Sequence, residues 1–555
     1  RARGQATQAA EGAQHVITVR RGVMRWSERD LPVMASLIGD DAAVAMRAPL
    51  NDALLRACAR RKLLLDERAS RLLTRALHLR KRAKAHKDDT TPIPPPHGAE
   101  RRAWPHQRRA LAFFAAMKRD SYLVADGTGV GKTLQALLWA ERIVRAKRTL
   151  IITPNAAKDQ WADAIHGFLG AEQRVTVVDG RIEDQVRQAS APRGWVVGHW
   201  ESLTHAANGY RALPWDAVVL DEAHHIGNRD TQRSQVAYRL RAAHRMALTA
   251  HPFTNHPGEL WGILRFLYPE VYTSYWRFFF LHVRAIPRAY GGFDVDPAGG
   301  VKRPKLLQWE LAPFTLQRSK QDVYPSLPSI VRVRRTVTLA PHARREYERM
   351  KQAVFAELEA LDGGTKLLPI FNDLARLTRL RQYVVDPGLL DARARSPKYD
   401  TVLELMQDLD GPPVIFTSFR EAAVRLGAVL KKARYRVAHI NGHVNREGRQ
   451  AAKKQFLAGQ LDALIVVTQA GGTALNLGKY GHVMFLDLPW TPRDLEQAEG
   501  RVDRPEEGTG ALVRTTAYRI IAKDTYEEKL EQKLVHKHRT FTQVFTVNDL
   551  KELFT

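Results

Sequence analysis

The feature that most constrains the fold of this chain is a set of short, mostly apolar runs separated by longer segments of helical periodicity. Such runs, without polar alternation, are typical of parallel strands buried on both faces of a sheet. The first series comprises YLVA (122–125), TLIIT (149–153), WVVGH (195–199), AVVLD (217–221) and MALT (246–249). The second comprises PVIFTS (413–418), RVAHI (436–440), ALIVVT (463–468) and VMFLD (483–487). The two series predict an α/β protein with two doubly wound lobes.

Composition and turn residues divide the rest of the chain. HVITVRRGVMRW (15–26) predicts one or two short strands, and leucines at helical spacing predict helices over 51–87. DDTTPIPPPHG (88–98) predicts a linker, because its prolines interrupt both helix and sheet. The predicted domains are an N-terminal accessory region (1–90), the first lobe (91–270), a helical insertion and inter-lobe linker (271–397), the second lobe (398–520) and a C-terminal helical segment (521–555).

The charge balance favours a polyanionic partner. The 555 residues include 86 Lys and Arg against 59 Asp and Glu, a net charge of +27, which is typical of proteins that neutralise nucleic acid phosphates. A single cysteine, Cys58, excludes an internal disulfide and a cysteine-based zinc site. The sequence contains neither an apolar run long enough to span a membrane nor a secretory signal pattern. We therefore expect no membrane partner, and a cytoplasmic, nucleoid-associated protein in a prokaryote or phage, or a nuclear one in a eukaryote.

DGTGVGKT (126–133) lies between the first apolar run and a segment of helical periodicity. A strand, a glycine-rich loop and a helix N-terminus in this order form a cradle for phosphate groups. Gly129 and Gly131 allow close approach of the backbone, Lys132 supplies a charge for the β and γ phosphates, and Thr133 offers a hydroxyl to Mg²⁺. The plain P-loop pattern has glycine where this chain has Asp126.

An acidic pair follows the fourth run, in VVLDEAHH. Because the carboxyl ends of parallel strands meet at one edge of a sheet, Asp221 and Glu222 should lie beside the phosphate loop. There Asp221 can hold the Mg²⁺ shell, and Glu222 can orient the attacking water.

The strongest signal is the 39-residue stretch from Val466 to Arg504. Charge that develops on a γ-phosphate needs a fixed guanidinium, which the opposite lobe supplies when a cleft closes. Arg501 and Arg504 are three residues apart and share one face if this stretch is helical.

These motifs, taken in order, resemble superfamily 2 helicase-like ATPases and, more narrowly, the Swi/Snf branch of DNA translocases. The resemblance covers about 101–555 and rests on WPHQRRA, DGTGVGKT, LIITPNAAKDQW, DEAHHIGN, LTAHPFTNHPGELWGILRFLYP and the 39-residue stretch. It implies two tandem RecA-like lobes with helical insertions and a C-terminal helical brace. It also makes Asp126 the family's own residue. The chain departs from the family at Gly127, at Ala250 and His251, and at Asp503 with the PEEG that follows Arg504.

The motifs and the resemblance together give the predicted site residues. The predicted catalytic residues are Lys132, Asp221, Glu222, Arg501 and Arg504. The predicted ATP-binding residues are Gln107, at the adenine-recognition position, Asp126, Gly127, Thr128, Gly129, Val130, Gly131, Lys132, Thr133, Gly472 and Gln497. Thr133 and Asp221 are the predicted Mg²⁺ ligands. By resemblance, the DNA-backbone contacts are Thr153, Lys158, Phe416, Thr417, Ser418, Asn441, Gly442 and Thr468.

The function predicted from the sequence is an ATP-dependent translocase on double-stranded DNA that remodels or displaces DNA-bound complexes. The alternatives are a helicase or fork-remodelling enzyme of the same superfamily and, from another class, a non-catalytic DNA-binding scaffold. Residues 1–90 could bind a protein partner. The aromatic run YWRFFFLHV (275–283) could stack on bases, although a buried helix is the favoured interpretation. His536 and His538 are interpreted as a solvated helix face rather than metal ligands.

Overall fold

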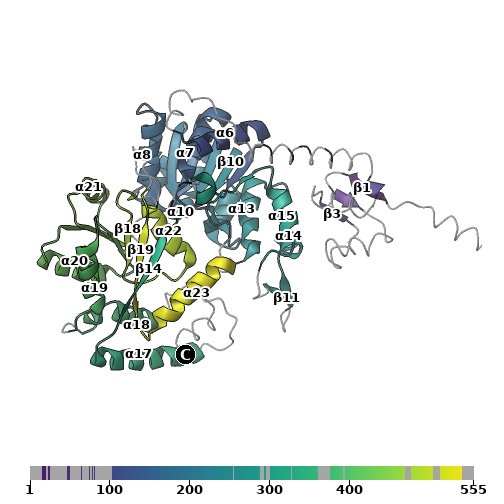
Figure 1. Ribbon diagram of the computed structural model, residues 1–555. Coiled ribbons are helices and arrows are strands. Elements are labelled where there is room, and N and C mark those ends of the chain that lie inside the picture. The colour runs from purple at the N-terminus through teal and green to yellow at the C-terminus, as the bar shows by residue number, and fades with distance from the viewer. Residues whose placement is uncertain are drawn as a thin grey trace, which may run out of the picture. The chain divides into compact units, whose positions relative to one another are not determined.

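The computed structural model describes most of the chain from Ala103 to Thr540, together with short N-terminal stretches (Figure 1). The described ranges are 16–20, 23–25, 47–49, 64–65, 103–253, 256–287, 293–295, 300–324, 328–360, 375–391, 394–468, 477–503 and 513–540, with the single residues Thr74, His78, Lys81, Ala85 and Ser326. By contacts between residues, the chain separates into two compact units. Unit 1 is built mainly from residues up to Gln317, and unit 2 mainly from Arg318 onward.

Unit 1 contains a seven-stranded parallel sheet with the order β13-β5-β10-β9-β6-β8-β7. Its strands are β5 (Ser121–Val124), β6 (Arg148–Thr153), β7 (Val175–Val177), β8 (Gly194–His199), β9 (Trp215–Asp221), β10 (Ala242–Leu248) and β13 (Thr315–Leu316). All five predicted runs form strands. The sequence prediction missed β7, which lies half-buried at one edge, and β13, which has only two residues.

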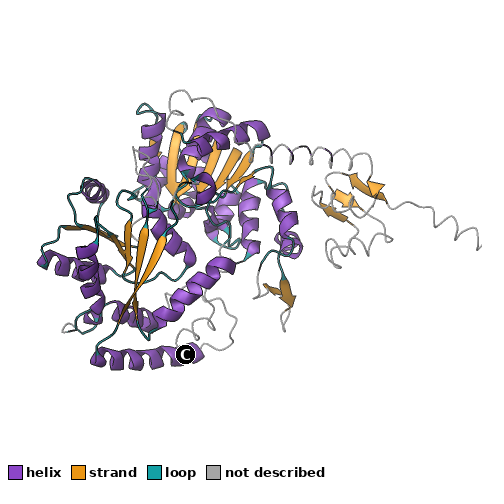
Figure 2. Cartoon of the chain, in the orientation of Figure 1, coloured by secondary structure: helices purple, strands orange, loops and turns teal. Residues whose placement is uncertain are grey.

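Helices flank this sheet (Figure 2). They are α6 (Pro105–Met117), α7 (Lys132–Leu138), η3 (Trp139–Val144), η4 (Asn155–Ala157), α8 (Lys158–Leu169), α9 (Ile182–Ala189), α10 (Trp200–His205), α11 (Ala207–Ala212), η5 (Ala223–Ile226), α12 (Gln232–Tyr238), η6 (Pro257–Glu259), α13 (Leu260–Leu267), α14 (Tyr275–His282) and α15 (Pro304–Leu311). The predicted helix after the phosphate loop changes from α7 to the π-helix η3. The short strands β11 (Ala285–Pro287) and β12 (Phe293–Val295) form an antiparallel pair beyond α14.

Unit 2 contains a six-stranded parallel sheet with the order β14-β19-β18-β15-β17-β16. Its strands are β14 (Val331–Val337), β15 (Val414–Thr417), β16 (Val437–Ile440), β17 (Ala463–Val467), β18 (His482–Phe485) and β19 (Thr516–Ala522). Its helices are α16 (Lys320–Val323), α17 (Pro341–Ala360), α18 (Ala375–Val385), η7 (Pro387–Leu389), α19 (Pro397–Asp408), α20 (Arg420–Lys432), α21 (Arg446–Leu457), α22 (Pro492–Val502) and α23 (Tyr526–Thr540). The four predicted runs form strands, so the predicted α/β class with two parallel-sheet lobes is confirmed.

Two strands of unit 2 lie where we predicted other structure. β14 falls in the segment predicted as insertion and linker, and its mostly exposed arginines mark it as an edge strand. β19 begins in the predicted second lobe, and its last two residues fall in the predicted C-terminal helical segment, where α23 follows. The segment 271–397 therefore adds β13 to the first sheet and β14 to the second.

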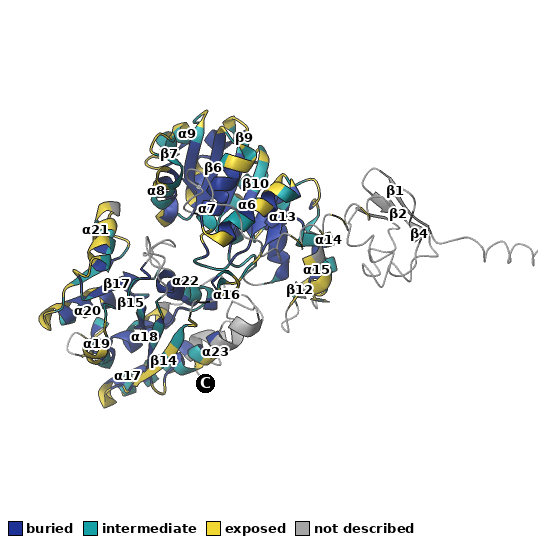
Figure 3. Ribbon diagram, turned by 45° about the horizontal axis from the view of Figure 1, so that its top comes forward, coloured by how far each residue is buried: buried dark blue, intermediate teal, exposed yellow. Residues whose placement is uncertain are grey.

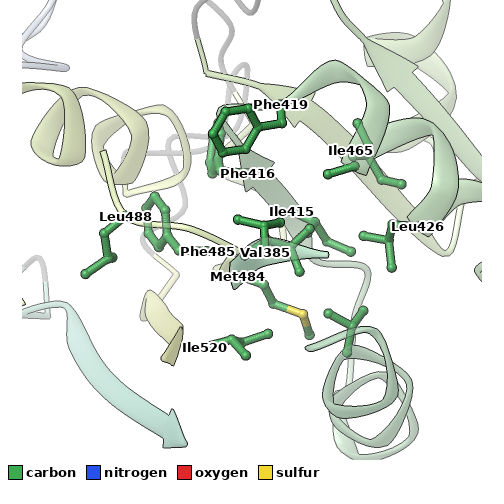
Figure 4. Packing of buried hydrophobic residues seen from close by; sticks show 14 of the residues in the cluster. Val385, Ile415, Phe416, Phe419, Leu426, Ile465, Met484, Phe485, Leu488 and Ile520 are labelled. Carbon is green, nitrogen blue, oxygen red and sulfur yellow. The ribbon is translucent and has the colours of Figure 1, made fainter. Parts of the chain in front are cut away.

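The core of unit 2 is one continuous cluster of buried apolar side chains (Figure 4). Phe416 of β15 stacks on Phe485 of β18 with ring centroids 5.6 Å apart, and Ile415, Ile465 and Ile520 are fully buried around them. Close packing of this kind fixes the directions in which the strands end.

The N-terminal residues form a separate small sheet with the order β3-β2-β1-β4. It comprises β1 (Val16–Arg20), β2 (Val23–Arg25), β3 (Arg47–Pro49) and β4 (Leu64–Leu65). The two strands predicted within 15–26 are present and pair antiparallel. β4 lies in the range predicted as helical, whereas Thr74, His78, Lys81 and Ala85 are helical and exposed. The linker 88–98 lies outside the described residues.

A fully buried ion pair joins α19 to α23 in unit 2. Lys398 Nζ donates to both carboxylate oxygens of Glu527, at 2.7 and 2.8 Å, and to Leu486 O at 2.6 Å. Ala522 N donates to Glu527 Oε2 at 2.8 Å, so the carboxylate is held on two sides. Burial raises the pKa of Glu527, and the Lys398 ammonium opposes that shift. The pair ties α23 to the end of β18.

We predict that Lys398→Met lowers the free energy of unfolding by about 3–5 kcal/mol, because it leaves an uncompensated buried carboxylate. The double variant Lys398→Met/Glu527→Leu should recover most of this loss, since no buried charge then remains. Urea denaturation followed by circular dichroism measures both. Arg436→Met, which breaks an exposed pair with Asp462, is the control and should cost less than about 1 kcal/mol. An equal loss in the single and the double variant would contradict this account.

Candidate functional site

In unit 1, the parallel strands bring the predicted site residues to one edge of the sheet. Leu248 of β10 is in register with Val124 of β5 on one side and with Asp221 of β9 on the other, so the three strands end level. β6 ends beside them at Thr153. The phosphate loop and the acidic pair therefore emerge at the same edge, as the sequence predicted.

The loop from Asp126 to Thr133 has the backbone of an anion cradle. Gly129 and Gly131 both have a φ of +78°, which favours glycine and turns successive N–H groups toward one side. Gly131 is the N-cap of α7, so the first turn of that helix faces the loop. Lys132 Nζ donates to Asp126 O at 2.8 Å and thus lies over the loop it closes.

Asp126 stands where the plain P-loop pattern has glycine, and its side chain has a structural function. Its side chain is fully buried, and its Oδ2 accepts from Gln135 Nε2 of α7 at 3.1 Å. The carboxylate therefore fastens the start of the loop to the helix that ends it.

Gln107 contacts the same loop from α6. Its Oε1 accepts from Trp104 N at 2.9 Å, which caps α6, and its Nε2 donates to Gly131 O at 3.2 Å. A Cβ atom on Gly131 would lie 2.2 Å from that Nε2. The structure thus brings Gln107 to the loop, while its contact with adenine stays a prediction.

The acidic pair has a defined orientation. Asp221 Oδ2 accepts from Thr153 Oγ1 at 2.8 Å, and its Oδ1 accepts from the Glu222 N–H at 3.0 Å. Glu222 has a φ of +50°, an uncommon conformation for a residue with a Cβ, and its Oε2 lies 3.2 Å from His224 Nδ1. The fixed Asp221 and the strained Glu222 have the pre-organisation expected of a reacting site.

These residues fit a nucleotide with Mg²⁺. In the described part of the chain, no side chain caps the first turn of α7, which leaves that end suited to an anion. Mg²⁺ is usually held by one or two carboxylates together with phosphate oxygens and water. Thr133 and Asp221 offer that kind of partial ligand set.

In unit 2, the second predicted set surrounds Asp487, just beyond β18. Asp487 Oδ1 accepts from Thr417 Oγ1 and from Ser418 N, both at 2.8 Å, and its Oδ2 accepts from Arg381 at 3.2 Å. Sequence reasoning did not single out Arg381, because nothing near it in the sequence signals a carboxylate more than a hundred residues away.

Of the two predicted arginines, Arg501 lies among the described residues, on α22. Arg501 is 4% exposed, and its guanidinium carbon lies 5.6 Å from the Phe416 ring centroid. Two residues earlier, Glu499 accepts a bidentate pair from Arg332 of β14, at 3.1 and 2.6 Å, and a bond from Arg519 of β19 at 3.3 Å. Glu499 was not predicted, although it lies inside the strongest motif. It fixes α22, which also carries Gln497, to two strands of the sheet.

The structure corrects part of the predicted DNA interface. The side chains of Phe416, Thr417 and Thr153 are fully buried, the first in the core and the others on Asp487 and Asp221. Their side chains cannot meet a DNA backbone from these positions. Asn441 Oδ1 accepts from His443 N at 3.0 Å, and Thr468 Oγ1 donates to Thr417 O at 3.1 Å.

Other predicted DNA contacts lie nearer to solvent. Ser418, Asn441 and Thr468 are partly exposed and Gly442 is exposed, whereas Lys158, at the start of α8, is 8% exposed and thus buried. Gly472 and Arg504 lie outside the described residues, as do the side chains of His536 and His538. None of the helices in the described ranges is both long and apolar enough to cross a membrane.

Comparison with known proteins identifies the family. A profile described as SNF2-related domain matches residues 106–389, just over half of the chain. The chain belongs to the SNF2-related family. A second profile, described as helicase conserved C-terminal domain, matches residues 397–506. The resemblance to the Swi/Snf branch of superfamily 2 is thereby confirmed, and with it the predicted class of helicase-like ATP hydrolase.

Individual relatives are distant and longer. YwqA of Bacillus subtilis, named as a candidate ATP-dependent helicase/translocase, is 26% identical over 81% of this chain and 50% of its own length. The human SWI/SNF-related matrix-associated actin-dependent regulator of chromatin subfamily A member 1 is 24% identical over 78% of this chain and 43% of its own length. The SNF2-related chain thus spans about half the length of these relatives.

One solved structure among the matches is the SWI2/SNF2 ATPase core of Sulfolobus solfataricus in complex with double-stranded DNA. It is 24% identical, the match covers 79% of this chain and 92% of that one, and the TM-score is 0.38.

We predict that Gly131→Ala weakens ATP binding about tenfold or more, because alanine disfavours the positive φ by roughly 1–2 kcal/mol and its Cβ displaces Gln107. Adding Gln107→Ala removes the collision but leaves the backbone strain and also removes the predicted adenine contact, so wild-type affinity should not return. Gly167→Ala in α8, where an added Cβ meets nothing within 4 Å, is the matched control. Titration with a fluorescent ATP analogue measures all three, and wild-type affinity in Gly131→Ala would show that the cradle geometry is wrong.

Proposed function

We propose that this SNF2-related chain is a DNA-dependent ATPase that uses ATP and Mg²⁺ to move along double-stranded DNA and displace complexes bound to it. The observation that carries the proposal is the arrangement at one edge of the first sheet. There Lys132 lies over a glycine loop that follows β5, and the end of β9, on the other side of β10, presents Asp221 fixed by Thr153. A non-catalytic DNA-binding scaffold does not require a lysine over a phosphate loop or an oriented carboxylate at the same sheet edge.

In this proposal, the loop N–H groups and Lys132 bind the phosphates of ATP, and Thr133 and Asp221 hold Mg²⁺. The ion would neutralise charge that develops on the transferred phosphoryl group. Glu222 would orient the attacking water, for which its strained backbone and its position next to the anchored Asp221 suit it. The residues Gly127, Thr128 and Val130 complete the loop around the phosphates.

Arg501 is proposed to stabilise the transition state from the second unit, together with Arg504. Its helix is held by Glu499 through Arg332 and Arg519, so the backbone that carries the guanidinium would be pre-positioned. Gln497 and Gly472 are proposed to contact the nucleotide from the same side.

Double-stranded DNA is the proposed track. The net charge of +27 favours a polyanion, and Lys158, Ser418, Asn441, Gly442 and Thr468 remain the proposed backbone contacts. Contacts with phosphates position a protein without reading sequence, which suits a motor. A helicase or fork-remodelling enzyme is the alternative, and a protein partner for residues 1–90 stays a prediction.

We predict that blunt duplex DNA stimulates ATP hydrolysis more than single strands do, that a triplex-forming strand is displaced, and that a plain duplex is not separated. Duplex affinity should fall steeply with salt and show no sequence preference. Lys132→Ala should abolish hydrolysis and keep duplex affinity within a few-fold, because the lysine meets nucleotide phosphates rather than DNA. Robust unwinding, or stimulation by single strands alone, would favour the helicase alternative.

We further predict that Arg501→Ala or Arg504→Ala lowers kcat by roughly 10³ or more and leaves ATP affinity nearly unchanged. A transition-state contact affects the rate, whereas a ground-state contact would weaken binding equally. Arg514→Ala, which removes an exposed arginine of the same unit, is the control. Single-turnover hydrolysis combined with nucleotide titration separates the two outcomes.

A further inference from the structure

The aromatic run 275–283 forms α14, but only one face of this helix is core. Phe278 and Phe279 are 4% and 3% exposed, and His282 is buried with its Nε2 3.1 Å from Glu310. On another face, Trp276 is 46% exposed and stacks on Phe280, with ring centroids 5.9 Å apart and planes inclined by 26°. The favoured interpretation of a buried helix is therefore correct for only half of the run.

The exposed aromatic surface continues onto the β11–β12 hairpin. Phe293 is 37% exposed, and its ring lies edge-on to Phe280 with centroids 4.9 Å apart, while Ile286 on the paired strand is 42% exposed. We call Trp276, Phe280, Ile286 and Phe293 the aromatic strip. α14, α15 and the hairpin lie together at one side of unit 1 (Figures 1 and 3). Large apolar side chains that gather in solvent usually mark a binding surface.

Positive charge surrounds the aromatic strip. Arg277 and Arg284 are exposed, and neither has a carboxylate partner among the described residues. Lys302 is exposed, and its Nζ donates to Phe280 O at 3.3 Å. Partial burial and, to a smaller extent, the neighbouring Arg303 lower the pKa of Lys302. The guanidinium carbon of Arg229 lies 3.9 Å from the ring centroid of Tyr275, the residue before Trp276 of the strip.

We propose that the aromatic strip binds unpaired nucleotides of a DNA strand, with bases stacked on Trp276 and Phe293 and phosphates facing Arg277, Arg284 and Lys302. The proposal rests on the proposed DNA-dependent function and adds a second, single-strand contact to it. Rings flanked by cations match a chain of flat bases and phosphates. An apolar protein surface would leave the cations uncompensated, and an intact duplex keeps its base faces stacked inside. A motor with this contact would recognise gaps, flaps or junctions on its track.

The test uses the full chain and fluorescence anisotropy with labelled oligo(dT) of about 20 nucleotides, longer than a typical single-strand site, and with a blunt duplex. Trp276→Ala should weaken oligo(dT) binding roughly tenfold, and Trp276→Ala/Phe293→Ala by more, because each ring stacks on a base. Trp276→Phe should keep most of the affinity, since it keeps a stacking ring. Duplex affinity and duplex-stimulated hydrolysis should stay within about twofold, because base pairing hides the base faces.

Charge variants test the strip without disturbing its packing. Arg277→Ala should reduce the steepness of the salt dependence of oligo(dT) binding by about one phosphate contact, while Arg193→Ala, exposed elsewhere in unit 1, should not. Leu213→Ala, which removes a 41% exposed apolar side chain elsewhere, controls for non-specific loss.

Three results would overturn the proposal: unchanged oligo(dT) affinity in Trp276→Ala, an equal loss for oligo(dT) and duplex, or altered self-association in sedimentation without a change in oligo(dT) affinity. The last would identify a protein interface. If duplex DNA failed to stimulate hydrolysis in the wild type, the motor would be rejected, while the oligo(dT) titrations would still decide the strip.

Discussion

The parallel pairing of buried strands is the constraint on which the rest of this structure depends. A strand buried on both faces must satisfy all its backbone groups in the sheet, and parallel neighbours then end at a common edge. Val124, Asp221 and Leu248 stand in one register because of that pairing. The phosphate loop, the acidic pair and Thr153 are neighbours for this reason, although almost a hundred residues separate them. The chemistry at the edge is a consequence of how the strands pair.

Carboxylates that are buried or, for Asp221, partly buried then fix the orientation of the residues at this edge and around Asp487 in unit 2. Asp126 is held by Gln135, Asp221 by Thr153, Asp487 by Thr417 and Arg381, and Glu499 by Arg332 and Arg519. In each case a carboxylate at or near the end of an element accepts bonds from a different element. A buried carboxylate is costly unless it is paired, so each arrangement tolerates few alternatives. These carboxylates hold the elements that carry the predicted catalytic residues in place. Side chains that face solvent can then contact ligands.

Aromatic residues from two apolar runs of the sequence have different environments in the structure, one in the core and one at the surface. Phe416 lies in a run that resembles a DNA-contact motif, yet it is stacked on Phe485 in the core. Trp276 lies in a run that favours a buried helix, yet almost half of it faces solvent. Both follow from the partner that each element meets: β15 is central in its sheet, while α14 covers the unit with one face and leaves the other open.

The sequence by itself determined the two parallel-sheet lobes and the family, and it predicted that Lys132, Asp221 and Glu222 meet at one sheet edge, because strand burial and phosphate-loop patterns depend on residues close together in the chain. It also singled out Arg501, which the structure places on a helix. Only the tertiary structure decided that Thr153 and Thr417 bond to carboxylates, that Glu499 anchors the arginine helix, and that β14 and β19 complete the second sheet. These features depend on contacts between residues far apart in the chain. Such contacts produce no periodicity or motif in the sequence, so one partner does not reveal the other.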